Sequence, residues 1–526
     1  MQPVNETTSQ KSLSAKIVLA AAILLPPLGL ILLWMKRDTD TDKKLLGSVG
    51  IVVLGALYIF LFAKAGMFSI FSSQPDPNAE AHYTELERHR AKQRQEPGAE
   101  TPAANSTEAT DTASGAVVAN PNPAATTDPA ATNSAALKPV KYSWTNYRGI
   151  NRDGRYDEQR VLTTWPADGL KPVWKQPIGG GYASFVVADN VAFTIEQRRN
   201  QEVVAAYNIQ NGRELWTYGW DASFVESMGG DGPRATPTWD EGKIYALGAT
   251  GELHCVDAKT GKKIWSKDIL KDNGATNLQW GMSASPLIVD DKVIVQPGGK
   301  SGKSIVAYNK NNGAAVWRTL NDAQAYVSPM LATLANRRQV VAITASRIVG
   351  LNPDDGAMLW EYPWDTSGGI NCSQAIPIDG NRFFVSAGYG KGAALVEVKD
   401  NGSKLSAGKV WENSNMKNKF NSSVILNGYA YGLDEGIMAC IDVATGERKW
   451  KGGRYGYGQV ILASDHLIVI SDTGDLALIK ATPDSYQEIA KFAALEGKTW
   501  NYPAIANGKL LVRNASQMAC FDIATK

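Results

Sequence analysis

Two long segments of the chain hold the residue types from which a binding or catalytic site could be built. The first, Thr217–Arg234, offers carboxylates that could accept a proton and a cation that could hold an anion. The second, Ser266–Met282, offers amides that could orient a polar ligand and an indole on which it could stack. The side chains in question are Asp221, Glu226, Asp231, Arg234, Asn277, Gln279 and Trp280.

The overall composition argues against several other functions: histidine-dependent hydrolysis, zinc binding and nucleic-acid binding. The chain has only 4 His, so a Ser-His-Asp triad or a zinc site with several histidines has almost no material. The 54 Lys and Arg nearly balance the 52 Asp and Glu, for a net charge of +2. Nothing in this balance indicates nucleic acid as a partner.

A repeated motif indicates the elements that must position these residues. Its clearest copy runs from Cys255 to Trp265 and reads small residue, x, Asp, x, x, Thr, Gly, three residues, Trp; a second copy runs from Cys440 to Trp450. The Asp can hydrogen-bond its own turn, the Gly supplies the positive φ of a tight loop, and the Trp fits a buried seam. Looser copies end at Trp216, Trp317, Trp360, Trp411 and, in decayed form, Phe492.

The closing aromatics recur about every 40 to 50 residues, which in strand-rich sequence is typical of propeller blades. Trp174 has no third strand ahead of it, and the last copy, Ala519–Thr525, stops before its Trp. The sequence therefore predicts an all-β, eight-bladed β-propeller, in which Pro172–Gln176 completes the blade that contains Gln517–Ile523. In one repeat the expected strands are Ser283–Val289, Lys292–Gln296, Ile305–Tyr308 and Ala315–Arg318.

The topology of such a blade predicts which candidate residues meet. Loops that enter the first strand share one face with the loops between the second and third strands, opposite the Asp–Gly turns. Loops on this face vary most in length, so we expect a functional funnel there; the alternative is that its Gly-Tyr-Gly and Trp-Asn-Tyr segments only pack the channel mouth. To the two long segments this face adds Tyr326, Asn371, Tyr389, Lys391, Lys419, Asn421, Asp434, Glu435, Arg454, Tyr455, Tyr457, Gln459, Trp500 and Asn501.

The Ala/Cys-x-Asp-x-x-Thr-Gly-x-x-x-Trp repeat resembles the pyrroloquinoline-quinone-type propeller repeat. The resemblance covers residues 142–526 and implies the fold, but the family includes both quinoprotein dehydrogenases and a non-enzymatic outer-membrane assembly-factor lipoprotein. Quinoprotein alcohol dehydrogenases typically stack their cofactor on a disulfide between adjacent cysteines, whereas no two of the 4 Cys here are adjacent. Cys255, Cys440 and Cys520 share one position in blades that are not neighbours, which indicates small core residues, and Cys372 has no evident partner.

If the protein were an enzyme, the resemblance implies a set of roles for the funnel residues. The quinone tricarboxylate would favour Arg234, Lys391 or Arg454. Asp231 and Asn277 would be a carboxylate and amide set for Ca²⁺, and Asp231 or Glu226 would be the base. No Cys-x-x-Cys-His haem attachment sequence is present, so electrons would leave through a partner.

Two apolar runs, Ile17–Met35 and Leu45–Ala63, precede the propeller, and each is close to the roughly 20 residues that span a bilayer. The basic segment Lys36–Lys44 between them indicates a cytoplasmic loop by the positive-inside rule. We therefore expect residues 1–70 to form a transmembrane hairpin in the cytoplasmic (inner) membrane, with the propeller on the extracytoplasmic side. A cleaved signal peptide is the rival interpretation of the first run.

Residues 71–141 are rich in Pro, Ala, Thr and Ser, and this composition predicts a disordered tether. Within it, Glu80–Gln95 has the charge and spacing of a short exposed helix.

Two hypotheses for function follow from this organisation. The first is a membrane-anchored binding or scaffolding module, without cofactor or metal, that presents its funnel to an envelope protein, peptide or glycan. The alternative is a quinoprotein dehydrogenase that uses pyrroloquinoline quinone and Ca²⁺ to oxidise an alcohol or a sugar.

Overall fold

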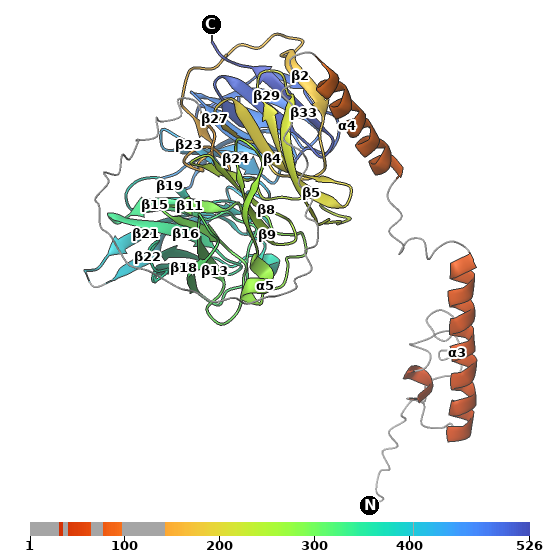
Figure 1. The fold of residues 1–526 in the computed structure, drawn as a ribbon. Helices are drawn as coiled ribbons and strands as arrows, with labels where there is room; N and C mark the ends of the chain where they lie inside the picture. Colours follow the sequence, from red (N-terminus) through yellow and green to blue (C-terminus); the bar gives the residue numbers. More distant parts are fainter. Residues whose placement is uncertain (1–30, 35–39, 65–76, 97–142, 403, 526) are drawn as a thin grey trace, which may run out of the picture. The chain divides into compact units, whose positions relative to one another are not determined.

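The computed structural model describes residues 31–34, 40–64, 77–96, 143–402 and 404–525. The chain divides into two compact units, Met1–Glu80 and Ala81–Lys526. The second unit contains eight sheets, which are the blades of the propeller (Figure 1). Each has four antiparallel strands, and in one of them a short fifth strand is added in parallel to the inner edge. The all-β, eight-bladed fold predicted from the repeat is therefore confirmed.

The N-terminal unit does not support the expected membrane hairpin. The second apolar run forms a helix, α3 (Thr41–Lys64). Within the described ranges, however, no helix combines the length and the apolar character that crossing a bilayer takes. Apart from residues 31–34, the first run lies outside the described residues.

Each blade is a meander whose first strand lies innermost, next to the first strands of its neighbours. The strands of blades 1 and 2 are β3 (Val186–Ala188), β4 (Val191–Arg198), β5 (Gln201–Asn208), β6 (Glu214–Asp221), β7 (Thr238–Asp240), β8 (Lys243–Leu247), β9 (Glu252–Asp257) and β10 (Lys263–Asp268). Those of blades 3 and 4 are β11 (Leu287–Val289), β12 (Lys292–Val295), β13 (Ile305–Asn309), β14 (Ala315–Thr319), β15 (Met330–Leu334), β16 (Arg337–Ile343), β17 (Arg347–Leu351) and β18 (Met358–Pro363).

The second half of the ring repeats the same order. Blades 5 and 6 contain β19 (Ile376–Pro377), β20 (Arg382–Ala387), β21 (Gly392–Asp400), β22 (Leu405–Asn413), β23 (Val424–Leu426), β24 (Tyr429–Asp434), β25 (Ile437–Asp442) and β26 (Arg448–Arg454). Blades 7 and 8 contain β27 (Gln459–Ala463), β28 (His466–Ile470), β29 (Asp475–Lys480), β30 (Glu488–Ala493), β31 (Ala504–Ala506), β32 (Lys509–Arg513), β33 (Gln517–Asp522) and β2 (Pro172–Pro177).

The ring closes where the two ends of the propeller sequence pair. β2 is the outermost strand of blade 8 and runs antiparallel to β33, with Trp174 opposite Cys520 and Lys175 opposite Ala519. This is the closure predicted from the incomplete first and last repeats. Pairing the ends leaves no blade with only part of its sheet.

The repeat motif joins neighbouring blades through its tryptophan. The indole Nε1 of Trp265 in blade 2 donates a hydrogen bond of 2.9 Å to the carbonyl of Lys310, in the turn of blade 3. Gly313 in the same turn has φ 71°, and a Cβ atom there would lie 2.8 Å from the Trp265 ring. The glycine is thus required both for the backbone conformation of the turn and for the close approach of the indole.

The aspartate of the motif holds the turn, as predicted. Asp257 Oδ1 accepts hydrogen bonds from the backbone N–H of Thr260 at 2.8 Å and of Lys259 at 3.1 Å. Blade 4 departs from the seam pattern, because Trp360 donates instead to the Gln339 side chain of its own blade. The cysteines of the described residues are free, and Cys255, Cys440 and Cys520 are buried as expected of small core residues.

A segment ahead of β2 crosses the central channel, a feature that the sequence analysis did not predict. Trp144 forms a bridge with Val187 in blade 1, whereas β1 (Arg155–Tyr156) runs parallel to β27 in blade 7. Between them, Arg148 donates to the carbonyl of Ser423 in blade 6 at 2.7 Å. Arg152 donates to Pro329 in blade 4 at 2.9 Å. Because these partners lie on opposite sides of the ring, residues 144–156 form a plug, and this name is used below.

The helix expected over Glu80–Gln95 forms as α4 (Pro77–Gln95), and most of its described side chains are exposed as predicted, but one side of it is buried against the propeller. Its Leu86 and Arg90 are 1% and 2% exposed. Arg90 donates to the carbonyl of Pro177 at 2.9 Å and pairs with Glu214 of blade 1 at 3.4 Å. This contact could not be predicted from the charged sequence of the helix, because the acidic partner Glu214 lies far away in the sequence. The remainder of the expected tether, residues 71–76 and 97–141, lies outside the described residues.

Two short helical segments complete the description of the loops. α5 (Ile269–Asn273) lies in the second long segment, and Asp268 caps its first turn by accepting from the backbone N–H of Lys271 at 2.9 Å. The 3-10 turn η2 (Ser367–Gly369) lies in the loop that enters blade 5.

Candidate functional site

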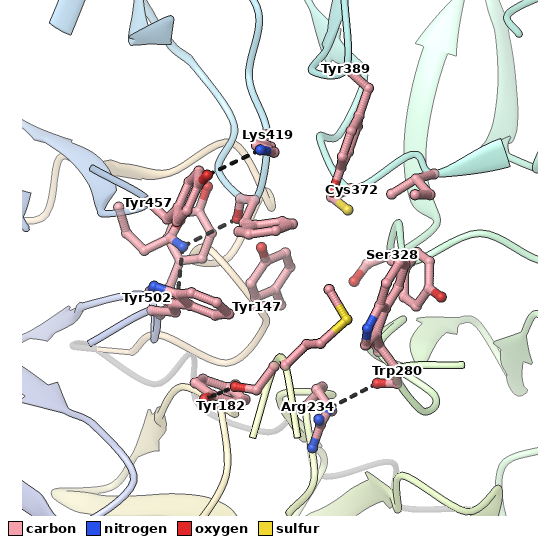
Figure 2. A pocket seen from close by; sticks show the side chains of 18 residues that line it. Tyr147, Tyr182, Arg234, Trp280, Ser328, Cys372, Tyr389, Lys419, Tyr457 and Tyr502 are labelled. Carbon is pink, nitrogen blue, oxygen red and sulfur yellow. Dashed lines mark hydrogen bonds between the residues drawn. The ribbon is translucent and has the colours of Figure 1, made fainter. Parts of the chain in front are cut away.

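A pocket of about 440 Å³ opens in the centre of the ring. Its lining comes from loops that enter the innermost strands of the blades, from Tyr389 in the turn between β20 and β21, and from Tyr147 of the plug. Figure 2 shows the labelled side chains arranged around an open centre. The lining side chains therefore gather on the face that the blade topology predicted.

Aromatic rings form one wall of the pocket and pack against one another. Trp500 stacks on Tyr182 with ring centroids 5.6 Å apart, and its other neighbours are Phe420 at 5.2 Å and Tyr457 at 5.8 Å. Contacts of this kind fix the rings in orientation and leave their remaining faces toward the cavity.

Three cations lie against aromatic rings in or beside the pocket. Lys419 Nζ lies 4.7 Å from the ring centre of Tyr457 and 5.0 Å from that of Tyr389, and it donates to the Tyr457 hydroxyl at 3.1 Å. Lys498 Nζ lies 4.1 Å from the Trp500 ring centre. Arg234 lies against Phe224, with its guanidinium carbon 4.4 Å from the ring centre. Such contacts hold a positive charge in place without neutralising it.

In the loops that enter the first strands, residues that line the pocket alternate with residues that hydrogen-bond to a neighbouring blade. In Trp500-Asn501-Tyr502, the two aromatic residues line the pocket, while Asn501 donates to the carbonyl of Gly181 at 3.1 Å and of Ala183 at 2.9 Å. The amide between the rings thus joins the loop of blade 8 to that of blade 1.

Asn371 has the corresponding position in blade 5 and donates to the Thr344 carbonyl of blade 4 at 3.0 Å. Ile370 and Cys372, on either side of it, line the pocket. These asparagines position the wall; they do not point into the cavity.

Two of the three carboxylates of the first long segment, Glu226 and Asp231, are engaged within their own loop. Glu226 accepts hydrogen bonds from the backbone N–H groups of Met228, at 2.9 Å, and of Gly229. Desolvation acts to raise its pKa, but these backbone hydrogen bonds outweigh it and leave the pKa of Glu226 lowered. Asp231 Oδ1 accepts from the backbone N–H of Glu226 at 3.0 Å. Neither side chain lines the pocket.

Three tyrosines and the thiol of the pocket are poor candidates for proton abstraction. Burial raises the pKa of Tyr182, Tyr326 and Tyr389 to about 12 in each case. Burial likewise raises the pKa of the Cys372 thiol to about 12. At neutral pH these groups are uncharged, so they can contribute hydrogen bonds and apolar contact area but no strong base.

Several of the residues predicted from sequence lie in the pocket lining and others do not. Lys391 pairs with Glu412 at 2.9 Å, and Asn277 donates to the Ala249 carbonyl at 2.9 Å, so both are engaged outside the cavity. Predicted residues that line the pocket are Arg234, Trp280, Tyr326, Tyr389, Lys419, Tyr457, Gln459 and Trp500. Predicted residues outside the lining are Asp221, Glu226, Asp231, Asn277, Gln279, Asn371, Lys391, Asn421, Asp434, Glu435, Arg454, Tyr455 and Asn501.

The structure adds lining residues that the sequence analysis did not select. Along the entry loops, residues that line the pocket alternate with residues that do not. This pattern would have identified the added residues that lie two positions from a predicted one, such as Tyr502 beside Trp500. Tyr147 follows an Asn, as Tyr502 does, but its place depends on the plug. The added residues are Tyr147, Tyr182, Met228, Gly229, Ser283, Ser328, Ile370, Cys372, Phe420 and Tyr502.

The pocket fits only part of a quinone cofactor and its cation. Arg234 and Lys419 could hold carboxylate groups of pyrroloquinoline quinone. Calcium requires several oxygen ligands, usually including carboxylates, whereas no Asp or Glu occurs in the lining. Across the described part of the chain, no cluster of three or more His, Cys, Asp or Glu could hold a metal. The donor set therefore does not fit bound Ca²⁺.

Comparison with known proteins finds relatives of both kinds. Outer membrane protein assembly factor BamB of Shewanella oneidensis is 24% identical over 270 residues, covering 48% of this chain and 65% of that protein. Quinohemoprotein alcohol dehydrogenase ADH-IIG of Pseudomonas putida is 27% identical over 185 residues, covering 31% of this chain and 24% of that enzyme. The chain thus spans less than two thirds of the length of either relative.

The fold is shared with a solved structure of the second kind. Quinohemoprotein alcohol dehydrogenase ADHIIG from Pseudomonas putida HK5 superimposes with a TM-score of 0.52 at 15% identity, over 73% of this chain and 81% of that one. A family model described as outer membrane protein assembly factor BamB matches residues 155–278 and 199–452. Because these matches together span more than half of the chain, the protein belongs to the outer membrane protein assembly factor BamB family.

Proposed function

We propose that the protein is a binding and scaffolding module of the cell envelope, and that its pocket face receives a protein partner outside the cytoplasm. The description of its family, as an assembly factor for outer membrane proteins, supports the envelope location and the kind of partner. The composition of the pocket carries the proposal, because rings and fixed cations without carboxylates suit recognition better than catalysis.

The rim of the pocket supports a protein partner in particular. The first long segment exposes Val225 and Met228, which are 73% and 67% exposed, and Met228 also lines the cavity. Exposed apolar side chains beside a concave site are typical of interaction surfaces. Methionine adapts its shape to different partners.

Photo-crosslinking in intact cells tests this function. A photoreactive phenylalanine derivative placed at Val225 should give a discrete adduct with an envelope protein, because the rim is where a partner would dock. The matched position is Lys259, which is exposed in an Asp–Gly turn at the opposite end of its blade. Adducts of equal yield from both positions, or adducts only with cytoplasmic proteins, would contradict the function and the location together.

The dehydrogenase remains the second candidate, because quinohemoprotein alcohol dehydrogenases are among the relatives. It would need a base and Ca²⁺ ligands in the pocket. Glu226 is a weakened base because its pKa is lowered, and neither Glu226 nor Asp231 lines the cavity.

Titration with pyrroloquinoline quinone distinguishes the two candidates. We expect the purified full-length protein to show no Ca²⁺-dependent, saturable quenching of tryptophan fluorescence and no dye-linked oxidation of alcohols or sugars. Trp280 and Trp500 line the pocket, so a bound quinone would quench them. Saturable quenching that requires Ca²⁺, together with turnover, would overturn the scaffold proposal.

A further inference from the structure

Two cations, Arg234 and Lys419, line the open pocket, and neither forms an ion pair with a described residue. Some buried or half-buried cations elsewhere have acidic partners: Lys310 pairs with Asp240 at 2.7 Å, and Arg347 pairs with Asp322 at 2.7 Å. Others, such as Arg148 and Arg152 of the plug, are buried among neutral acceptors and closed off from any ligand.

Among the residues that the structure describes, no Asp or Glu forms an ion pair with Arg234, Lys419 or Lys498. Arg234 and Lys419 line the pocket and are therefore available to a ligand, whereas Lys498 lies beside the lining residue Trp500. Glu226 acts on Arg234 and Lys498 only at longer range than an ion pair.

Neutral groups hold all three cations in place. Arg234 donates to the Trp280 carbonyl at 2.8 Å and to two carbonyls of its own loop. Lys498 donates to the carbonyls of Gly229, at 2.7 Å, and of Met228, at 3.1 Å. Burial lowers the pKa of both side chains, which means that each has lost hydration that an anionic oxygen could replace.

The rest of the lining is apolar or aromatic, so the anion must belong to a molecule with apolar groups beside its charge. Tyr147 and Tyr502 meet edge to face, with ring centroids 5.1 Å apart, and both line the cavity. The volume of about 440 Å³ suits a few side chains and not a folded domain. Val225 and Met228 on the rim would contact the residues that flank the inserted part.

We propose that the pocket binds a short, extended segment of a partner polypeptide in which a carboxylate lies next to an aromatic side chain. The inference rests on the proposed binding function and names the chemistry that the pocket selects. The carboxylate would contact Lys419, and the aromatic side chain would pack among the tyrosine and tryptophan rings. The carboxylate could come from a chain terminus or from an Asp or Glu side chain, and the experiment separates these sources.

Peptide binding to the purified full-length protein tests the inference. The probes are N-acetyl-Gly-Ser-Gly-Tyr-Phe with a free C-terminus, the same peptide amidated, and amidated N-acetyl-Gly-Ser-Asp-Tyr-Phe with its Asn counterpart. Binding is followed by tryptophan fluorescence and calorimetry. We expect one or both carboxylate peptides to bind about 10-fold or more tightly than their neutral counterparts, since a hydrogen bond to a charged group contributes roughly 1.5–3 kcal/mol.

A matched pair of lysines provides the control. Lys419→Met should remove the preference for the carboxylate, because Lys419 Nζ lines the cavity and has no ionic partner. Lys391→Met should leave the preference unchanged, although Lys391 also stands over an indole, 4.4 Å from the Trp364 ring centre, because it pairs with Glu412 outside the pocket. Increasing salt should weaken the carboxylate peptides more than the amides.

Three outcomes would overturn the inference. They are equal affinity for each carboxylate peptide and its neutral counterpart, equal losses in Lys419→Met and Lys391→Met, and no saturable binding of any peptide at about 1 mM, the weak end of specific affinity. If pyrroloquinoline quinone binds tightly and no peptide binds, the inference is also overturned. The ligand of the pocket would then be a small aromatic anion and not a polypeptide. If peptide selectivity fails while crosslinks from Val225 persist, the scaffold function stands and only the carboxylate inference falls.

Discussion

Deleting residues 1–177 should make the propeller aggregate or melt at a much lower temperature, whereas deleting residues 1–157 should leave a folded ring. Only the longer deletion removes β2, the outermost strand of blade 8. Without β2 the edge of β33 is open, and Trp174 no longer donates to the Ile209 carbonyl of blade 1, a bond of 2.9 Å. An open edge and an unsealed seam at the same place favour aggregation.

Calorimetry and light scattering measure this difference. The 1–157 deletion removes α4 and the plug, so we expect a lower melting temperature with a single transition. For the 1–177 deletion we expect aggregation or a further drop on the order of 10 °C, since a loss of several kcal/mol shifts the melting temperature by about 2–4 °C per kcal/mol. Equal melting temperatures for the two deletions would contradict closure of the ring by β2.

The fold could be predicted because each repeat carries its own structural information. The Asp-x-x-Thr-Gly turn is stabilised by hydrogen bonds within three or four residues, as Asp257 shows. It can therefore be predicted from a short stretch of sequence. The Trp that follows marks the seam at a fixed distance. The closure by β2 was predictable from the same pattern, since the first and last repeats are each incomplete.

The site was predictable only as far as topology determines it. Topology gives the face on which the entry loops lie, and the structure brings Trp280, Lys419 and Trp500 together on that face. It does not give the direction of each side chain in an irregular loop. Lys391 turns away because Glu412 on the neighbouring strand binds it, a contact that no local pattern contains.

Two features were invisible in the sequence because long-range contacts create them. The plug is held by Arg148 and Arg152, whose partners are backbone carbonyls more than a hundred positions later. Backbone acceptors carry no sequence signal. Likewise α4 resembles a solvated helix by composition, and its docking depends on contacts with distant residues, such as Arg90 with Glu214 and His89 with Gln176.

Replacing Trp265 by Ala should lower the free energy of unfolding by about 3–5 kcal/mol, the usual range for deleting a buried Trp or Phe. The indole is only 8% exposed, it fills the space that Gly313 leaves open, and its Nε1–H satisfies the Lys310 carbonyl. Equilibrium unfolding in denaturant, followed by circular dichroism, measures the change. The loss should weaken the seam between blades 2 and 3 in particular, because the ring and its acceptor lie on different blades.

Two neighbouring substitutions separate the contributions of the ring and of the hydrogen bond. Ile264→Ala alters the adjacent position on the same strand, where the side chain is 43% exposed, so it should change stability by no more than about 0.5 kcal/mol. Trp265→Phe keeps an aromatic ring against Gly313 but removes the Nε1 donor, so its cost should lie between the two. The loss of this hydrogen bond should contribute only about 0.5–1.5 kcal/mol, because the Lys310 carbonyl still accepts from the Tyr245 hydroxyl at 3.1 Å. A Trp265→Ala loss no larger than that of Ile264→Ala would show that the repeat tryptophan is not a seam anchor. The repeat would then encode only the turn, and the stability of the ring would have to come from the inner strands.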